Sequence, residues 1–306
     1  MRMLAPTVRA VSLTAALLAL PLTGVSAQDA HLEMLGTAFQ EELDAIARDM
    51  PGVFGVQVID LTTGQRFGVN DQLVFPQGSA IKVPILIELF RQADRGELRI
   101  GETVTIRDED AVGGSGYLRH FLNGASSLSL HDLAIMMITI SDNMATNLLI
   151  ERVGMQNVTR TMAQMGLPET KLQRRMIRPE ESKRGNENLS TATEAATIMA
   201  RIYRCELPMS AELCRQMRDI LEIPHAGAIA DAVPGSIVVG QKTGSITGVA
   251  VNWGYVALPD RPYVIAAMGN YGDTGRIQRS IRDATAVAHA YFARLQNATM
   301  HGTRVR

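Results

Sequence analysis

The sequence predicts an α/β (α+β) fold of two lobes: an antiparallel five-stranded sheet flanked by the N- and C-terminal helices, and an inserted all-α lobe. Strand patterns occur near both ends of the chain, and mostly helical patterns fill the segment between them. A ribbon of two strands alone is marginally stable. The two front strands are therefore expected to join the three back strands in one sheet.

The first segment, residues 1–27, has the features of a secretory signal peptide. Arg2 and Arg9 give it a positive start, and its short apolar run VSLTAALLALPLTG is interrupted by Pro21. The sequence Val25–Ala27 is a small-residue cleavage signal. We expect an exported protein, periplasmic or secreted, without a stable membrane span after cleavage. An uncleaved N-terminal membrane anchor is the alternative.

Composition is that of an ordinary globular protein. The 306 residues are 46% hydrophobic and 20% charged, and the formal net charge is -1. Residues 1–27 contain two arginines and no acidic residue, so their removal changes the net charge to -3. This balance predicts neither a nucleic-acid partner nor binding to an anionic membrane.

The front of the predicted α/β lobe spans residues 28–76. Apolar residues recur at helical spacing over residues 31–49, and Pro51-Gly52 ends this helix. The sequence VFGVQVID then predicts a strand, LTTG a turn and QRFGV a second strand. The helical residues are Leu32, Leu35, Phe39, Leu43 and Ile46.

The predicted all-α lobe spans residues 77–222. Within it, Ser129 is a candidate N-cap with Asp132 three residues later, and an almost unbroken apolar helix follows, as expected in the middle of a domain.

The remainder of the α/β lobe is residues 223–306. It contains strand patterns in SIVVGQKTG, VAVNWGYVAL and PYVIAAMGN and a final helix from about Gly275 to Leu295. A cleft between the two lobes is the expected place for a site.

The only two cysteines are Cys205 and Cys214, in the exported part of the chain. They stand near the end of one predicted helix and the start of the next, a geometry that allows a bridge. We predict one disulfide. Two buried free thiols are the alternative, because spacing along the sequence does not fix the distance between Cα atoms.

The stretch FPQGSAIKVPILIELF places Ser79 and Lys82 at the start of an apolar helix. Residues i and i+3 are neighbours on a helix face, with Cβ atoms about 5–6 Å apart. A serine hydroxyl needs a base to act as a nucleophile, and a desolvated lysine can be that base. Free N–H groups at a helix start suit a developing oxyanion. Alone, Ser-x-x-Lys is expected about once by chance in a chain of this length.

Two further motifs support a catalytic interpretation. Ser141-Asp142-Asn143 follows directly after the buried helix, where Ser141 can relay a proton and Asn143 can hold a substrate amide. Lys242-Thr243-Gly244 ends a predicted strand and can offer a cation and a hydroxyl to a carboxylate, with the glycine allowing close approach. The alternatives are an ordinary turn and a solvated lysine.

The three motifs, in this order, resemble those of the class A β-lactamases and the related penicillin-binding proteins. Similar stretches are GSAIKVPILIELFRQADRGEL, LSLHDLAIMMITISDNMATNLLIERVG and GQKTGS, so the resemblance covers most of the chain. It implies the β-lactamase/transpeptidase-like fold of two lobes derived above, in one domain over residues 28–306.

The resemblance also implies a role for each matching residue. Ser79 is the acylated nucleophile, and Lys82 its base or proton relay. Ser141 passes a proton toward the leaving nitrogen, and Asn143 binds the acyl side-chain amide. The other implied residues are Lys242 and Thr243 for the substrate carboxylate, and the backbone N–H groups of Ser79 and Ser245 for the oxyanion.

One departure from the family concerns the general base for deacylation. The family has a glutamate in the loop after the Ser-Asp-Asn helix, and matching TKLQRRM to that loop places Met176 there. Asn147, the partner of this glutamate in the family, remains. Glu180 and Glu181 are the candidate substitutes, with Glu187 further along, and solvated loop charge is the other interpretation.

A second departure is that no arginine directly follows KTGS to reinforce carboxylate binding. Arg276 is the nearest candidate.

Other chemistries lack support in the sequence. The six histidines are scattered without metal-ligand spacing, and no Gly-x-Ser-x-Gly elbow or phosphate loop occurs. We therefore expect no metal, no cofactor and a monomer. The expected function is a serine hydrolase of the class A β-lactamase type with slow deacylation. The alternatives are a penicillin-binding D,D-peptidase acting on peptidoglycan stem peptides, and a β-lactam-binding module without turnover.

Overall fold

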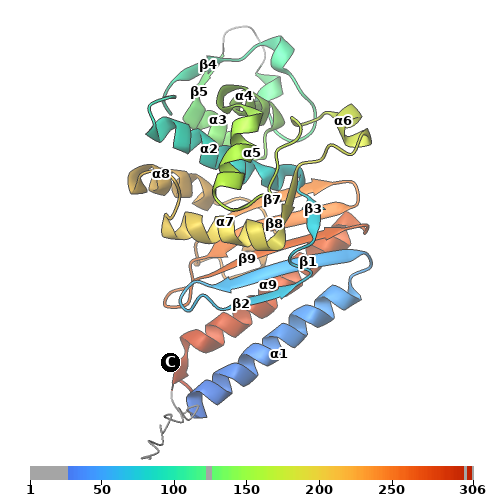
Figure 1. Cartoon of the computed structure of the whole chain (residues 1–306), viewed down its shortest axis with the longest axis vertical. Coiled ribbons are helices and arrows are strands. Elements are labelled where there is room, and N and C mark those ends of the chain that lie inside the picture. The colour runs from blue at the N-terminus through green and yellow to red at the C-terminus, as the bar shows by residue number, and fades with distance from the viewer. Residues whose placement is uncertain (1–26, 122–125, 300–301, 305–306) are drawn as a thin grey trace, which may run out of the picture.

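The computed structural model describes residues 27–121, 126–299 and 302–304. Residues 1–26 of the predicted signal peptide lie outside the described residues. Figure 1 shows a helical part above a sheet, with two long helices beneath the sheet. This arrangement confirms the predicted mixed α/β fold with a five-stranded antiparallel sheet. Within the described part of the chain, no helix is long and apolar enough to cross a membrane.

The front and back strands form one sheet, as predicted. Its strand order is β2-β1-β9-β8-β7, and every neighbouring pair is antiparallel. Strand β1 pairs with β9 along its whole length, from Val53 opposite Asn270 to Asp60 opposite Tyr263. The strands are β1 (Val53–Asp60), β2 (Arg66–Val69), β7 (Val239–Ile246), β8 (Val249–Val256) and β9 (Tyr263–Asn270).

Helices cover both faces of this sheet. Helices α1 (Ala27–Asp49) and α9 (Thr274–Gln296) lie side by side beneath it (Figure 1), where the rings of Phe39 and Tyr291 stack with centroids 4.6 Å apart. Helix α7 (Ala192–Arg204) lies against the other face and contacts β1, β8 and β9. A helix of the predicted all-α segment therefore packs directly on the sheet, because its buried alanine, isoleucine and methionine side chains match the apolar strands.

The helical part surrounds α2 (Lys82–Asp94) and also contains short strands that the sequence did not predict. Its helices are α3 (Leu130–Thr139), α4 (Asn143–Val153), α5 (Met155–Gln164), α6 (Pro179–Lys183) and α8 (Ala211–Glu222). Short 3-10 turns are η1 (Gly78–Ile81), η2 (Asp108–Asp110), η3 (Leu118–His120) and η4 (Ala230–Ala232). The strand pairs of this part are β3 (Val74–Pro76) with β6 (Leu189–Thr191) and β4 (Thr103–Thr105) with β5 (Ser127–Ser129). A third pair, β10 (Ala298–Thr299) with β11 (Gly302–Thr303), follows α9 at the C-terminal end of the chain.

The predicted N-cap of the central apolar helix is confirmed. The Ser129 hydroxyl accepts a hydrogen bond from the Asp132 backbone N–H at 3.0 Å, and the Asp132 carboxylate accepts one from the Ser129 backbone N–H at 3.4 Å. The helix that follows, α3, ends just before the Ser-Asp-Asn turn and so fixes where that turn lies.

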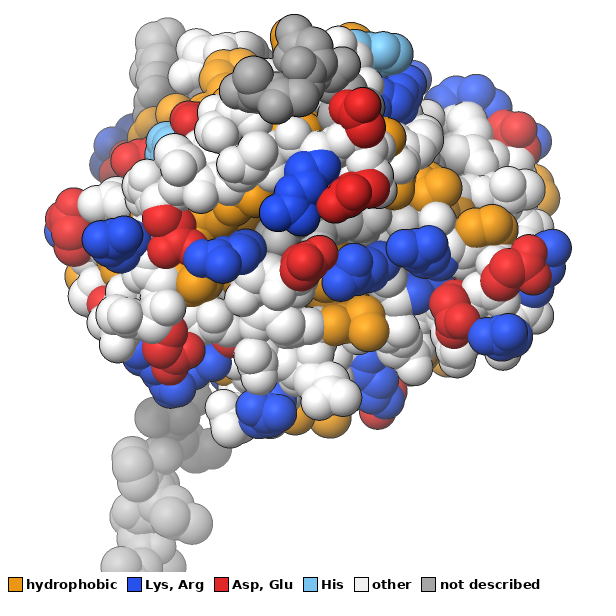
Figure 2. All heavy atoms as spheres, turned by 90° about the horizontal axis from the view of Figure 1, so that it is seen from above, with side chains coloured by type: hydrophobic (Ala, Val, Ile, Leu, Met, Phe, Trp, Pro, Cys, Tyr) orange, Lys and Arg blue, Asp and Glu red, His pale blue; other side chains and the backbone are white. Residues whose placement is uncertain are grey.

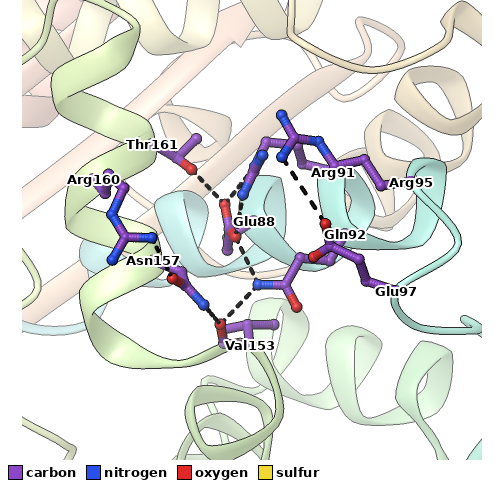
Figure 3. Close-up of polar contacts among 9 residues, drawn as sticks. All are labelled: Glu88, Arg91, Gln92, Arg95, Glu97, Val153, Asn157, Arg160 and Thr161. Atoms are coloured by element: carbon purple, nitrogen blue, oxygen red, sulfur yellow. Dashed lines mark hydrogen bonds and ion pairs between the residues drawn. The ribbon is translucent and has the colours of Figure 1, made fainter.

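A buried polar cluster fixes α2 to its neighbours (Figure 3). The Glu88 carboxylate, whose side chain is fully buried, accepts two hydrogen bonds from the Arg91 guanidinium at 2.7 and 2.8 Å. It also accepts from the Thr161 hydroxyl of α5 at 2.6 Å and from the Gln92 amide at 2.6 Å. The Gln92 amide donates in turn to the Val153 carbonyl at the end of α4, at 2.7 Å.

These contacts keep the buried carboxylate charged. Burial alone raises the pKa of Glu88, but hydrogen bonds from Arg91, Thr161 and Gln92 outweigh it and hold the pKa below its ordinary value. Removing one partner of such a buried pair typically costs about 3–5 kcal/mol. The helix that follows the candidate nucleophile is therefore firmly held at its centre.

The two cysteines form the predicted disulfide. Cys205 ends α7 in a left-handed conformation with φ 53°, and Cys214 lies in the first turns of α8. Their Cα atoms are 5.6 Å apart, within the usual range for a bridge. The prediction of one disulfide is confirmed, and the alternative of two free thiols is wrong.

The surface seen from above has charges of both signs. In Figure 2, basic and acidic side chains alternate over this face, with small hydrophobic areas between them. Neither sign gathers into one large area on the part of this face that is described.

Candidate active site

The candidate nucleophile lies in a tight turn between the two parts of the molecule. Ser79, half-buried, belongs to η1 rather than to the α-helix, which begins at Lys82. The buried side chain of Gln77 holds the turn: its amide donates to the Phe75 carbonyl at 2.8 Å, and its oxygen accepts from the Trp253 indole of β8 at 2.9 Å. Sequence reasoning missed Gln77, and its only signal was a lone amide before an apolar helix.

Two glycines let strand β7 approach this turn closely. Gly78 has φ 48°, and a Cβ built on it would lie 2.9 Å from the Ser245 backbone nitrogen. A Cβ on Gly244 would lie 2.2 Å from the Gln77 carbonyl oxygen and 2.9 Å from the Ser79 nitrogen. Side chains at either position would separate the strand from the turn. The backbone N–H groups of Ser79 and Ser245 consequently lie in neighbouring segments.

Lys82 is fully buried and its ammonium group is surrounded by acceptors. Its Nζ donates to the Ser141 carbonyl at 2.7 Å, to the Ser141 hydroxyl at 3.0 Å and to Asn143 Oδ1 at 3.1 Å. Burial lowers the pKa of Lys82 well below its ordinary value, the Lys242 charge lowers it further, and only the Asp142 carboxylate opposes them. A lysine in this environment loses its proton easily and can act as a base.

The Ser-Asp-Asn turn presents Ser141 and Asn143 to Lys82. Ser141 adopts φ 55°, an uncommon conformation for a serine, between α3 and α4. The Asp142 carboxylate fixes the turn by accepting from the backbone N–H groups of Ala145 at 2.9 Å and Leu118 at 2.8 Å. The segment is a turn, as expected, and Asp142 and Asn143 are both buried within it.

Asn143 connects this turn to the opposite wall of the cleft. Its Oδ1 accepts from Lys82, and its Nδ2 donates to the Gly113 carbonyl at 3.2 Å. An amide NH₂ has a second hydrogen, which remains able to bind a substrate carbonyl.

Lys242 is buried although it lies on β7, an edge strand of the sheet. Its Nζ donates to the Thr243 carbonyl at 2.9 Å. Burial lowers the pKa of Lys242 to about 7. The interpretation of Lys242 as a solvated strand-edge lysine is therefore wrong.

Two cavities meet at Ser245. The first, of about 390 Å³, is bounded by the Ser79 turn, Asn143 and the loop around Met176. The second, of about 540 Å³, lies beyond Thr243 and Gly244 and is bounded by α9.

The second cavity contains two arginines that sequence reasoning missed. Arg279 and Arg282 of α9 line it, whereas Arg276 does not and donates to the Asp49 carbonyl at 3.5 Å. The three arginines are spaced by three residues along one helix, so the sequence alone could not tell which of them faces the strand.

The loop after the Ser-Asp-Asn helix brings no carboxylate to the cleft. Met176, 5% exposed, lines the first cavity, and Asn147 holds its backbone by accepting from its N–H at 2.8 Å and donating to its carbonyl at 3.2 Å. Glu180 and Glu181 line neither cavity. They pair with Lys183 at 2.9 Å and Arg184 at 2.8 Å on the exposed surface of α6.

Glu187, the third carboxylate near this loop, is also engaged elsewhere. It forms an ion pair with Arg174 at 2.7 Å. Within the described part of the chain, no cluster of histidine, cysteine, aspartate and glutamate is arranged to hold a metal ion.

We expect acylation at this site to slow at alkaline pH. The lowered pKa of Lys82 favours its neutral form, which can act as a base, but above about pH 7 Lys242, with a pKa of about 7, loses the charge that attracts a carboxylate. The check is the second-order rate constant for acylation by a penicillin, measured below and above pH 7. In Lys242→Arg the guanidinium stays charged, so the alkaline decline should move to higher pH. An alkaline decline that stays in place would contradict this assignment.

Comparison with known proteins gives one consistent family. The profile of the beta-lactamase enzyme family matches residues 38–292. Among curated proteins, beta-lactamase CARB-4 of Pseudomonas aeruginosa is 29% identical over 159 residues, which are 51% of this chain and 54% of that protein. The chain thus spans about half the length of the first curated relatives it matches.

Solved structures match over a longer range. A beta-lactamase from Sphaerobacter thermophilus is 30% identical with a TM-score of 0.76, covering 84% of this chain and 97% of that one. PBP-A is 26% identical with a TM-score of 0.76, covering 84% and 96%. A leucine-to-glutamate variant of PBP-A, described as an acyl-enzyme complex with penicillin G, has a TM-score of 0.75 at the same identity, covering 84% and 97%.

Proposed function

The chain belongs to the beta-lactamase enzyme family, and from this premise we propose that it is a serine hydrolase acylated by β-lactams on Ser79. The observation that carries the proposal is the environment of Lys82. This buried lysine, three residues after Ser79, is hydrogen-bonded to Ser141 and Asn143, and its pKa is lowered well below the ordinary value, first by burial. A serine next to a lysine in this state has the base it needs.

The proposed chemistry assigns each proton to a group. Neutral Lys82 takes the proton of the Ser79 hydroxyl as Oγ attacks the lactam carbonyl, and the backbone N–H groups of Ser79 and Ser245 stabilise the oxyanion. The C–N bond then breaks, an ester forms on Ser79, and Ser141 passes the proton from Lys82 to the leaving nitrogen. Lys242 and Thr243 bind the carboxylate of the leaving part.

Arg279 and Arg282 are positioned to assist carboxylate binding. They line the cavity beyond Thr243 and Gly244, so they supply positive charge on the side where the leaving part would lie. We propose that they replace the arginine that is missing after KTGS.

Within this proposal the class A β-lactamase type is the first function, with slow deacylation. The second is a penicillin-binding D,D-peptidase that acts on peptidoglycan stem peptides, and one observation favours it: Met176 lines the cleft where a base for water would be needed. The similarity to PBP-A, of which a leucine-to-glutamate variant is described as an acyl-enzyme complex with penicillin G, supports acylation by penicillin as the first step.

The lifetime of the acyl-enzyme, followed by intact mass after mixing with penicillin, tests the proposal. We expect a mass increase of one penicillin that decays slowly. Steady-state hydrolysis of a chromogenic cephalosporin would identify a β-lactamase, and release of D-alanine from a stem-peptide analogue would identify a peptidase. A stable adduct with neither activity would identify a β-lactam-binding module, and the absence of any adduct would refute acylation.

We propose that the protein is exported, periplasmic or secreted, and acts as a monomer on small molecules or stem peptides. Support comes from the leader-like sequence of residues 1–27 and from the disulfide between Cys205 and Cys214, which is typical of an oxidising compartment.

A further inference from the structure

The ionisable side chains that line the cavity beside Ser79 are all basic. Its ionisable lining residues are Arg174 and Arg178, and no acidic residue of the described chain lines it. Arg174 is largely buried, and its guanidinium is bound by the Glu187 carboxylate at 2.7 and 3.0 Å. Its charge is therefore already compensated within the loop.

Arg178 is different because its charge has no such partner. The residue is exposed, and among the described residues no carboxylate lies within ion-pair distance of it. Glu180 and Glu181, its neighbours in the chain, are paired with Lys183 and Arg184. Among the described residues that line this cavity, Arg178 is therefore the cation without a carboxylate partner.

The backbone of the loop determines that this cation faces the cavity. Asn147 holds Met176 at both its N–H and its carbonyl, and Ile177 then adopts φ 54°. Such a conformation is a strained outlier for a β-branched residue, and strain of this kind concentrates at functional sites. The chain turns sharply here, so Ile177 and Arg178 both line the cavity before Pro179 begins α6.

We propose that Arg178 is a specificity-determining residue that selects acyl donors with a second carboxylate on the acyl side of the scissile bond. The inference rests on the proposed function, in which Asn143 binds the acyl side-chain amide. Arg178 and Asn143 line the same cavity, whereas Thr243 and the arginines of α9 line the other one. The carboxylate bound by Lys242 is therefore a different group from the one that would meet Arg178.

Two sources could supply this carboxylate. One is a penicillin with an anionic side chain, and the other is a peptide acyl donor with a free carboxylate near its D-alanyl end. Both present an anion beside an amide on the acyl side, and Arg178 would recognise this shared chemistry.

A pair of penicillins that differ by one carboxylate tests the proposal. Acylation rate constants are measured for α-carboxybenzylpenicillin and benzylpenicillin, and their ratio is compared between proteins, which cancels differences in intrinsic reactivity. In Arg178→Gln we expect the ratio to fall by about twofold to fivefold, the range for an exposed ion pair. Arg178→Glu should lower it further. In the wild type the ratio should fall as salt is raised, because exposed charges are screened.

Lys183→Gln is the matched control. It removes one positive charge from the same loop, but Lys183 is paired with Glu180 and does not line the cavity, so the ratio should stay unchanged.

The peptide source is tested with two stem-peptide analogues whose acyl-side carboxylate is free or amidated. A preference that depends on Arg178 in either pair supports the proposal and identifies the source. Ratios that are the same in the wild type, Arg178→Gln and Arg178→Glu for both pairs would overturn it. Loss of acylation by every compound in the wild type would instead be a failure of the proposed function.

Discussion

Ser79→Ala should abolish covalent labelling of the purified protein by a fluorescent penicillin. The alanine has no oxygen to form the ester, so we expect no residual adduct. The measurement is the fluorescence of the protein band after denaturation, with the circular dichroism spectrum as a check that the fold is intact. Ser79 is half-buried in η1, and its hydroxyl makes no hydrogen bond to the described residues, so the variant should fold.

Two further variants sharpen this result. Ser115 also lines the cavity, so Ser115→Ala is the matched control and should keep the label. Lys82→Ala should slow labelling by about 10²–10⁴-fold, since it removes the general base but leaves the nucleophile. Continued labelling of Ser79→Ala, or loss of label in Ser115→Ala alone, would show that the nucleophile has been assigned to the wrong serine.

Much of the fold could be predicted because local signals were strong. The strand VFGVQVID lies between Pro51-Gly52 and the turn LTTG, and β1 has the same bounds in the structure. The Ser129–Asp132 cap was predicted from two residue types three positions apart, because only this spacing lets each side chain reach the backbone N–H of the other residue at a helix start. The joining of the two front strands to the three back strands in one sheet followed from the marginal stability of a two-stranded ribbon, whereas the pairing of β1 with β9 was not predicted.

The burial and the partners of several site residues depend on long-range contacts, which spacing along the sequence does not reveal. Lys242 is on an edge strand, yet the chain around it buries it and lowers its pKa to about 7. Gln77 acquires its role only because Trp253, far along the chain, reaches its side-chain oxygen. The choice of Arg279 and Arg282 over Arg276 depends on the rotation of α9 about its axis.

The loop after α5 was only partly predictable. Matching the loop to the family placed Met176 in the position of the missing base, and the structure places this residue on the cleft beside Asn147. Asn147, which in the family is the partner of this glutamate, binds the Met176 backbone instead. The left-handed Ile177 could not be predicted, since a β-branched residue is the last type expected there.

Met176→Glu should speed deacylation of a penicillin acyl-enzyme by at least about tenfold, a modest share of the 10²–10⁴-fold range for a general base. A thioether is only a weak acceptor and cannot take a proton from water, whereas a carboxylate can. Asn147 uses one amide hydrogen on the Met176 carbonyl, so its second hydrogen is available to orient the new carboxylate. The measurement is the decay of the acyl-enzyme by intact mass.

Met176→Gln distinguishes the effect of a general base on deacylation from the effect of a changed side-chain shape. Its side chain has the size of glutamate but takes no proton at neutral pH, so deacylation should stay as slow as in the wild type.

A different set of results would place the base elsewhere: rapid turnover of penicillin by the wild type, no change in Met176→Glu, and loss of activity in Glu180→Gln or Glu181→Gln. For that to occur, one of these glutamates would have to leave its ion pair on α6 and enter the cleft. Exposed ion pairs of this kind are worth only about 0–1 kcal/mol, so breaking the pair would not prevent such a movement. The deacylation rates of these variants therefore decide whether position 176 or one of these glutamates is the place of the general base.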